Sequence, residues 1–440
     1  MRMSVRMRVL KMRASEYVRY DSFVARTVIA IVSILLSSMM NMFGKRSLSR
    51  KLLMYLHRNA VSPISDAYAE SMINKLIRNG DSFRLEYIQS VRATERTRRF
   101  FHEPQRLVGT RVLVLKSPES EERGVMLVDY SFVFPLLARR FGIGEIMQRY
   151  HIVIEPSWSG ACDDDVLALS EFGNVFVQSN EPRDIEFMKR SGAELTPVPI
   201  AANWWVDTRV FRPLDGIEKD ADILINASWA KFKRHERIFA ALSRLRRRGR
   251  RLKAILVGYE VDLSRTELTA LAAEYGILDQ LEFHEGVTPT EVNVLLNRSR
   301  VNLIWSRREG SNRAVIEGMS AGVPGIMRCG FNYGHQYPFV SENLVEFATE
   351  DTLPNALLRV IDRNSDGSPR TWIERNMNPQ IATTLVDEVI GRYCCQHGEK
   401  WTRGKLAVKV SSLHAMEYWE QKERERFLND YTFIRGVITN

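Results

Sequence analysis

The most informative chemical feature of the sequence is a pair of glutamates eight positions apart. Residues 306–322 read SRREGSNRAVIEGMSAG, with Glu309 just before Gly-Ser-Asn and Glu317 inside the apolar run that follows. Carboxylates accept hydrogen bonds from hydroxyl groups, and the unpaired N–H groups at a helix start suit an anion. This combination fits a ligand that carries both hydroxyls and phosphates. The structural alternative is a capped helix with two solvated glutamates, because this spacing is common by chance.

The elements on either side place this segment at the end of a buried strand. VNLIWS, from Val301, is expected to form the strand, and RAVIEGMSA a helix that ends at Gly322. In an open parallel sheet, ligands gather in the crevice at the carboxyl ends of the strands. Gly310 lets the backbone approach a ligand closely, and Ser311 or Asn312 is predicted to cap the helix.

Alternating strands and helices predict two domains, each built on a parallel sheet covered by helices on both faces. The strands of the first are expected at RVLVLK, GVMLVDY, HIVIEP and NVFVQS, and those of the second at ADILINA, LKAILVG, LEFHEG, VNLIWS and VPGIMR. Between the two sets, three prolines and a turn-rich stretch predict a linker. The predicted divisions are a basic N-terminal extension at 1–104, a first Rossmann-like domain at 105–205, a linker at 206–218, a second Rossmann-like domain at 219–362 and C-terminal helices at 363–440.

Four segments, in order, resemble glycosyltransferase family 4 (glycosyl transferases group 1) of the GT-B fold. IAANWWVDTRVFRP is similar to the family's linker, and NASWAKFKRHERIFAAL to a strand, loop and helix in which a lysine meets the donor diphosphate. AILVGYE followed by LEFHEGV resembles the family's Val-Gly loop and its next strand. EGSNRAVIEGMSAGVPGI resembles the segment with two glutamates. The resemblance implies two Rossmann-like domains facing each other across a cleft that holds the active site, with C-terminal helices crossing back to the first domain.

The resemblance also implies roles for residues of the second domain. Glu309 would contact hydroxyls of the transferred sugar, and Lys233 would neutralise the diphosphate leaving group. Glu317 would hold the ribose hydroxyls. The other donor-binding positions that it implies are Gly310, Ser311, Asn312, Arg313, Ser228 and Gly258. Ser228 stands where the family usually has an arginine, and the candidates to supply that charge are Lys231, Arg234 and Arg313.

The acceptor side of the site is less well specified by the sequence. Glu155 and Trp158 follow the strand HIVIEP and are predicted to line it, with packing as the more common role of an aromatic such as Trp158. A histidine with which the family often touches the sugar has no clear counterpart. The run Asp163-Asp164-Asp165 allows a metal site, but a solvated helix start is favoured. No metal is predicted, because the family resembled needs none.

The predicted activity is transfer of a hexose or similar sugar from a nucleoside diphosphate sugar to a glycan or lipid-linked acceptor. Retention of configuration and independence of metals and other cofactors follow from the same resemblance. One alternative is an inactive GT-B module that binds a nucleotide or a glycan, which Ser228 and the missing histidine favour. Another is a nucleotide-sugar epimerase or a phosphorylase on the same fold.

The N-terminal region is basic and contains one uncharged, largely apolar segment, Thr27 to Gly44. A spanning helix usually needs about 20 apolar residues, so this segment is at the short end. A membrane anchor, a helix in the lipid headgroup layer and a soluble leader all stay open, and a start at Met39, Met40 or Met42 would remove the segment. The predicted location is the cytoplasm, at the inner face of the cell membrane if the basic N-terminus binds lipid.

Charge and cysteines narrow the class of protein further. The net charge of +10 invites a nucleic-acid partner, but the densest basic run, RLRRRGRR at 244–251, stands at a predicted helix end. It has no interleaved aromatic residues for base stacking, so no nucleic acid is predicted. The four cysteines lack metal-binding spacing and are expected to be free thiols.

Overall fold

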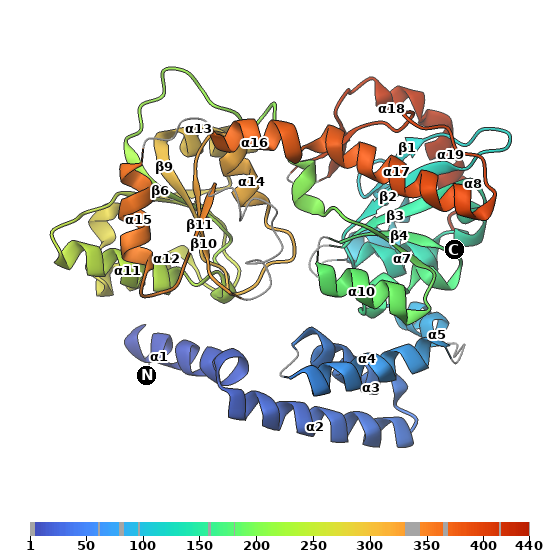
Figure 1. Cartoon of the computed structure of the whole chain (residues 1–440), viewed down its shortest axis with the longest axis horizontal. Helices are drawn as coiled ribbons and strands as arrows, with labels where there is room; N and C mark the ends of the chain where they lie inside the picture. The colour runs from blue at the N-terminus through green and yellow to red at the C-terminus, as the bar shows by residue number, and fades with distance from the viewer. Residues whose placement is uncertain are drawn as a thin grey trace. The chain divides into compact units, whose positions relative to one another are not determined.

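The chain forms two compact units in a computed structural model (Figure 1). The first unit comprises Glu16–Trp205 with Pro379–Asn440, and the second comprises Met1–Ser15 with Val206–Asn378. The structure describes residues 5–59, 62–78, 83–95, 97–156, 160–179, 181–330, 344–363, 368–412 and 415–439. Within these ranges it confirms the predicted fold class, because both units are α/β with largely parallel sheets and the N-terminal region is helical.

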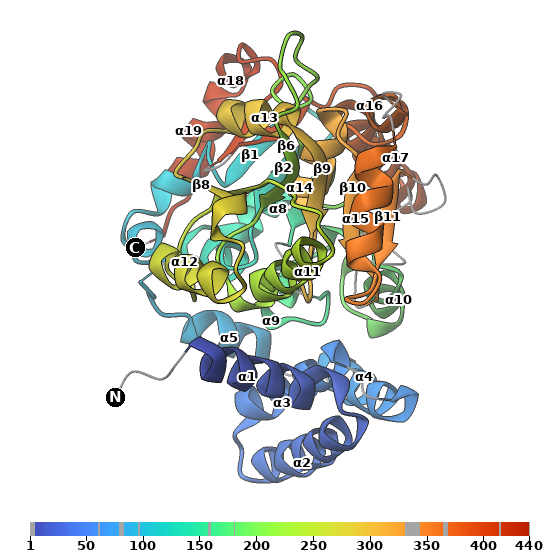
Figure 2. The same cartoon turned by 90° about the vertical axis from the view of Figure 1, so that its left-hand side faces the viewer.

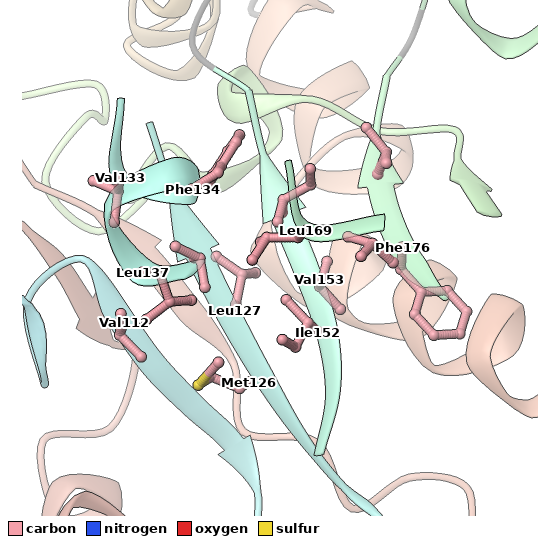
Figure 3. Packing of buried hydrophobic residues seen from close by; sticks show 14 of the residues in the cluster. Val112, Met126, Leu127, Val133, Phe134, Leu137, Ile152, Val153, Leu169 and Phe176 are labelled. Carbon is pink, nitrogen blue, oxygen red and sulfur yellow. The ribbon is translucent and has the colours of Figure 1, made fainter. Parts of the chain in front are cut away.

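A five-stranded sheet forms the centre of the first unit. In order across the sheet, its strands are β1 (Val112–Lys116), β2 (Gly124–Asp129), β3 (Tyr150–Glu155), β4 (Val175–Gln178) and β5 (Leu195–Val198). β1 to β4 are buried along their whole length, as their predominantly apolar sequences predict. Figure 3 shows Leu127 of β2 beside Leu137 of α7 (Val133–Arg140), within the apolar core of this unit.

The remaining α-helices of this α/β part come from both chain segments of the unit. They are α8 (Ile143–Arg149), α9 (Asp164–Leu167), α10 (Pro182–Ser191), α17 (Pro379–His397), α18 (Glu423–Arg426) and α19 (Leu428–Gly436). The C-terminal tail, which was predicted as helical, also contains the antiparallel pair β12 (Lys409–Ser411) and β13 (Met416–Tyr418).

Strand β1 departs from the predicted parallel arrangement, because it runs antiparallel to β2 while β2 to β5 are parallel. Only residues 117–123 join β1 to β2, and Glu119 pairs with Glu122 inside that connection. A parallel neighbour requires a crossover of a dozen or more residues. The short connection therefore forces a hairpin.

The predicted N-terminal extension is divided between the two units. Helices α2 (Phe23–Met42), α3 (Arg46–Arg58), α4 (Pro63–Arg78), α5 (Phe83–Ser90) and α6 (Arg98–His102) belong to the first unit. All of α1 (Val5–Glu16) but its last residue groups with the second unit, where Arg13 Nη2 donates to the Tyr275 hydroxyl at 3.1 Å.

The three consecutive aspartates join the N-terminal helices to the α/β part of the first unit. Asp163 caps α9, as a helix start requires, but the segment is not solvated as predicted. Asp164 is 4% exposed and accepts hydrogen bonds from Arg50 Nε at 3.2 Å and Arg50 Nη2 at 3.1 Å. Tyr87 of α5 donates to Asp165. The carboxylates of Asp164 and Asp165 are thus bound by an arginine of α3 and a tyrosine of α5.

The second unit contains a six-stranded sheet in which every neighbouring pair is parallel. Its strands are β6 (Ala221–Asn226), β7 (Ala254–Gly258), β8 (Leu281–Glu285), β9 (Ser299–Ile304), β10 (Gly325–Arg328) and β11 (Val345–Ala348). The order is β11-β10-β9-β6-β7-β8, which is the order of a doubly wound Rossmann sheet. The five predicted strands are all present, and β11 is an additional edge strand.

Besides α1, the described part of the second unit contains six α-helices, of which α15 was not predicted from the sequence. They are α11 (His235–Arg247), α12 (Arg265–Glu274), α13 (Pro289–Arg298), α14 (Arg313–Ser320), α15 (Leu353–Asp362) and α16 (Ser368–Asn376). Thr288 and Glu291 form the capping box of α13, and Gly322 adopts the left-handed conformation after α14 with φ +75°. The position of Gly322 confirms the predicted end of α14. The four cysteines are free thiols, as predicted.

We expect replacement of Arg50 by methionine to destabilise the first unit, because Asp164 would be left buried without its cation. Removing one partner of a buried ion pair typically costs about 3 to 5 kcal/mol. The matched control is Lys75→Met, since Lys75 is an exposed lysine of α4 in the same unit; a change within about 0.5 kcal/mol is expected there. Urea unfolding measures both, and equal effects would contradict a structural role for the Arg50–Asp164 pair.

Candidate functional site

The candidate site lies where the winding of the second sheet reverses. β6 and β9 are neighbours, but β7 follows β6 on one side and β10 follows β9 on the other. The loops that leave their carboxyl ends, 227–234 and 305–312, therefore diverge from one point. Such a switch point is where open α/β sheets bind their ligands.

Lys233 and Glu309, which were predicted from separate motifs, meet at this point. Lys233 ends the short helical turn η5 (Lys231–Lys233), and its Nζ lies 2.5 Å from Glu309 Oε1. Both side chains are mostly buried. The two loops are also joined through the backbone, because the Arg307 N–H donates to the Phe232 carbonyl at 2.6 Å. The site thus holds a cation and a carboxylate in direct contact.

The first turn of α14 is fixed to the sheet beneath it. Asn312, rather than Ser311, caps the helix by accepting from the Val315 N–H at 3.0 Å. From within β9, Asn302 Nδ2 donates to the Ala314 carbonyl at 2.6 Å. Gly318 permits this close contact, since a Cβ there would lie 2.3 Å from Asn302 Nδ2. The N–H groups at the start of α14, near Arg313, therefore have a fixed position.

Glu317 lies inside α14 and is 8% exposed. Asn226, the last residue of β6, donates to its Oε2 at 3.0 Å, and Arg313 Nη2 lies 3.8 Å from Oε1. Burial raises the pKa of Glu317, while Arg313 and Asn226 act in the opposite direction. Asn226 was missed in the sequence, because an asparagine at a strand end carries no signal of its partner.

His235 holds the loop that carries Lys233. It is the first residue of α11, it is buried, and its Nε2 lies 3.2 Å from the Ser228 carbonyl. Burial lowers the pKa of His235 to about 4, so the ring is neutral at pH 7. Because a carbonyl only accepts, Nε2 carries the proton. The contact between Ser228 and His235 thus involves the backbone carbonyl of Ser228.

Gly258, at the end of β7, is required by packing against the same loop. A Cβ at this position would lie 2.3 Å from the Ala227 carbonyl and 2.6 Å from Trp229 Nε1. No side chain fits without moving the backbone that follows β6. The structure therefore places Gly258 beneath the loop of Lys233.

The positive charge that Ser228 does not supply has three candidate sources besides Lys233. Arg234 is buried and donates to Glu350 at 2.7 Å, so its charge is already paired with an acid. Arg313 stands at the start of α14, one turn before Glu317. Lys231 is exposed on the surface of the loop. Of the three candidates, Arg313 has the position closest to the helix N-terminus at which an anion would bind.

The predicted acceptor-side residues belong to the first unit. Glu155 ends β3 and is buried, with its Oε2 2.5 Å from Nζ of the fully buried Lys409. Asp129 ends β2 opposite Glu155 and accepts from Arg111 at 2.8 Å. Burial, and secondarily the charge of Glu155, raises the pKa of Asp129 to about 7. Trp158 lies outside the described residues.

A second cluster in the first unit brings together residues whose sequence spacing gave no metal signal. Among the described residues, His151, Cys394 and Glu399 place one ligand atom each within 4.8 Å of one another. Cys394 Sγ lies 3.3 Å from His151 Nε2, and Arg123 Nη2 lies 2.6 Å from Glu399 Oε1. The guanidinium already neutralises this carboxylate, so hydrogen bonds account for the cluster.

Comparison with known proteins gives a family match within the second unit. The family model of glycosyl transferases group 1 matches residues 208–364, which confirms the resemblance for that part of the chain. No curated protein sequence matches the chain.

Similar solved structures are found for a larger part of the chain. Sucrose-phosphate synthase from Thermosynechococcus elongatus is 16% identical with a TM-score of 0.46, covering 62% of this chain and 73% of that one. Anabaena HepE in complex with UDP and glucose is 12% identical with a TM-score of 0.46, covering 60% and 77%. The lipopolysaccharide outer core galactosyltransferase WaaB is 14% identical with a TM-score of 0.43, covering 68% and 80%.

Replacement of Gly258 by alanine is expected to destabilise the second unit and to disturb the loop of Lys233, because the Ala227 backbone must move. Overpacking of this kind costs about 1 to 3 kcal/mol. The control is Gly436→Ala, since no atom lies within 4 Å of a Cβ at Gly436. Urea unfolding of both variants checks the expectation, and an unchanged Gly258→Ala protein would contradict the close contact.

Replacement of Asp129 by asparagine is expected to alter how stability depends on pH. The pKa of Asp129 is about 7 in the folded chain against an ordinary value of 3.8, so the folded state holds this proton more tightly. Between those values the contribution of Asp129 to the free energy of unfolding falls as pH rises, by about 1.4 kcal/mol per pH unit at most. Asparagine does not titrate, so the variant lacks this pH-dependent contribution to the free energy of unfolding. Urea unfolding of both proteins at several pH values measures it, and a pH-independent difference would contradict the raised pKa.

Proposed function

We propose that this chain, whose residues 208–364 match the family model of glycosyl transferases group 1, transfers a sugar from a nucleoside diphosphate sugar to a glycan or lipid-linked acceptor. The observation that carries the proposal is the contact between Lys233 and Glu309 at the switch point of the second sheet. A diphosphate needs a cation, and a sugar needs an acceptor for its hydroxyls. The site offers both within one contact, beside the start of a helix.

Glu317 and Asn226 are proposed to bind the nucleoside. The Glu317 carboxylate is buried and oriented by the amide of Asn226 at 3.0 Å, so its position does not depend on the ligand. A carboxylate accepts from both hydroxyls of a ribose diol, and a low local dielectric strengthens these hydrogen bonds. Burial raises the pKa of Glu317 and so favours its neutral form. Hydrogen bonds donated by the ligand would act in the opposite direction and favour the charged form.

Lys233 is proposed to stabilise the leaving diphosphate. When the bond between the sugar and the diphosphate breaks, negative charge develops on the phosphate oxygens, and a fixed cation lowers the barrier. The N–H groups at the start of α14, which Asn312 and Asn302 hold in place, would add to this stabilisation. These groups take the part that a metal ion plays in other transferases, so we propose that the reaction needs none.

Glu309 is proposed to change partner when the donor binds. Its carboxylate contacts Lys233 Nζ at 2.5 Å, and the donor diphosphate competes for the same ammonium group. A glutamate released from that contact is free to accept from sugar hydroxyls and to stabilise positive charge that develops at the reacting carbon. Retention of configuration, which the family resemblance implies, is proposed together with this role.

A non-catalytic module is the second candidate, because Ser228 replaces the family's arginine and acts here through its backbone. Such a module would bind a nucleotide sugar through Glu317 and Asn226 without turning it over. The two candidates differ in turnover rather than in binding.

The experiment measures release of nucleoside diphosphate from UDP-, GDP- and ADP-sugars with a metal chelator present. We expect release from one donor, and a drop of about a hundredfold or more in Lys233→Ala and in Glu309→Gln. Lys253→Ala is the matched control, because Lys253 is 42% exposed and lies just before β7, at the edge of the sheet opposite the site. Its activity should stay within about twofold of the wild type.

Three outcomes separate the candidates. Release lost in both site variants and kept in the control supports the transferase. A donor that raises the Tm without any release, even with added glycan or lipid-linked acceptors, supports the non-catalytic module. If no donor is turned over and none raises the Tm, the proposed site is wrong.

A further inference from the structure

Helix α2 presents a continuous apolar face that no described part of the chain covers. Among its exposed side chains, Val24 is 72%, Leu35 63% and Met42 80% exposed. The other large apolar side chains exposed on or just after this helix are Phe23, Val28, Ile31, Val32, Leu36, Met39 and Phe43. Of the helices in the described part of the chain, α2 is the one long and apolar enough to cross a membrane. An apolar surface of this extent marks a protein or membrane contact.

The opposite side of α2 is held against the neighbouring helices. Ala30, Ser33 and Ser37 are buried there, at a spacing that places them on one side of the helix. Ser37 Oγ lies 2.8 Å from Ser49 Oγ of α3, and Ala30 packs with Leu56 of α3 and with α4. Figures 1 and 2 both show α2 lying along α3 and α4. These contacts fix the rotation of α2 with its apolar face outward.

This packing is incompatible with α2 crossing a bilayer. If α2 crossed a bilayer, the α3 helix packed along it would enter the bilayer too, and α3 carries Arg46, Arg50 and Lys51. Placing an arginine or lysine side chain near the bilayer centre costs about 2.5 to 3.5 kcal/mol. Arg50 also binds Asp164 of the α/β part, so α3 cannot leave that part for the membrane. The packing of α2 on α3 therefore favours a position of α2 in the plane of the membrane surface.

The charges at the ends of α2 indicate the kind of surface. Arg26 is the single charged residue between Ser22 and Gly44, and every charged residue from Lys45 to Lys51 is basic. Lys45, Arg46 and Lys51 are exposed. A helix with an apolar face and flanking basic residues lies in the headgroup layer of membranes that contain anionic lipids.

We infer that α2 binds the surface of a bilayer containing anionic lipids, lying in its plane with its apolar face toward the acyl chains. The contact belongs to the first unit and does not involve the donor site. It is independent of the proposed transferase activity, and it holds the first unit at a membrane whether or not the chain turns over a sugar.

The test is flotation of the full chain with vesicles of phosphatidylcholine alone and with about 30 mol% phosphatidylglycerol. We expect binding to the anionic vesicles, weaker binding to the neutral ones, and binding about tenfold weaker or more for Leu35→Asp. Leu428→Asp is the matched control, since Leu428 is a similarly exposed leucine on α19 of the same unit. It should bind as the wild type does.

A second measurement distinguishes lying on the membrane from spanning it. Protein in the plane of the surface is released from vesicles by alkaline carbonate, whereas a spanning helix is retained, and retention would overturn the inference. So would a lack of binding to either vesicle. If Leu35→Asp instead converts a lipid-free dimer to a monomer and vesicles bind neither protein, a second copy covers the face and the inference fails. Nucleoside diphosphate release measured on the same samples reports separately on the proposed activity.

Discussion

The pairing of β6 with β9 is the constraint on which the candidate site depends. Two strands that are separated in sequence by β7 and β8 become neighbours, and their following loops turn to opposite sides. Lys233 and Glu309 can touch only because these loops leave the same edge of the sheet. A parallel sheet brings all its carboxyl ends to that edge, so one pairing determines where a cation, a carboxylate and a helix start converge.

Buried polar contacts then fix the details of the site. Asn226 orients Glu317, Asn302 holds the first turn of α14, and neutral His235 holds the carbonyl of Ser228. A buried polar group is costly when it is left unpaired, so each of these contacts selects one arrangement of its loop or helix. A donor would therefore meet groups that are already in place, with the Lys233–Glu309 contact as the part that must exchange partners.

The first unit is organised by buried charge pairs in the same way. Arg50 and Asp164 join the N-terminal helices to the sheet, and Lys409 reaches Glu155 at the end of β3. Because α3 is fixed by its ion pair, α2 is fixed through Ser37 and Ser49, and its apolar side has to face outward. The same polar contacts that give the unit one structure thus leave one hydrophobic surface without a partner in the described chain.

The sequence by itself determined the α/β class, the strands with unbroken apolar runs and the stop at Gly322, and these features follow from local periodicity and turn chemistry. It also indicated Lys233, Glu309 and Glu317, through the spacing of the two glutamates and the resemblance of the surrounding segments to a known family. The edge strands β5 and β11 were not predicted from the sequence, because they are four residues long and only partly buried, and β5 contains Pro197. The partners Asn226 and Lys409 and the outward rotation of α2 were decided by tertiary structure alone. The reason is that each depends on contacts between residues far apart in the chain, such as the separation of 254 between Glu155 and Lys409, and no local pattern encodes such a partner.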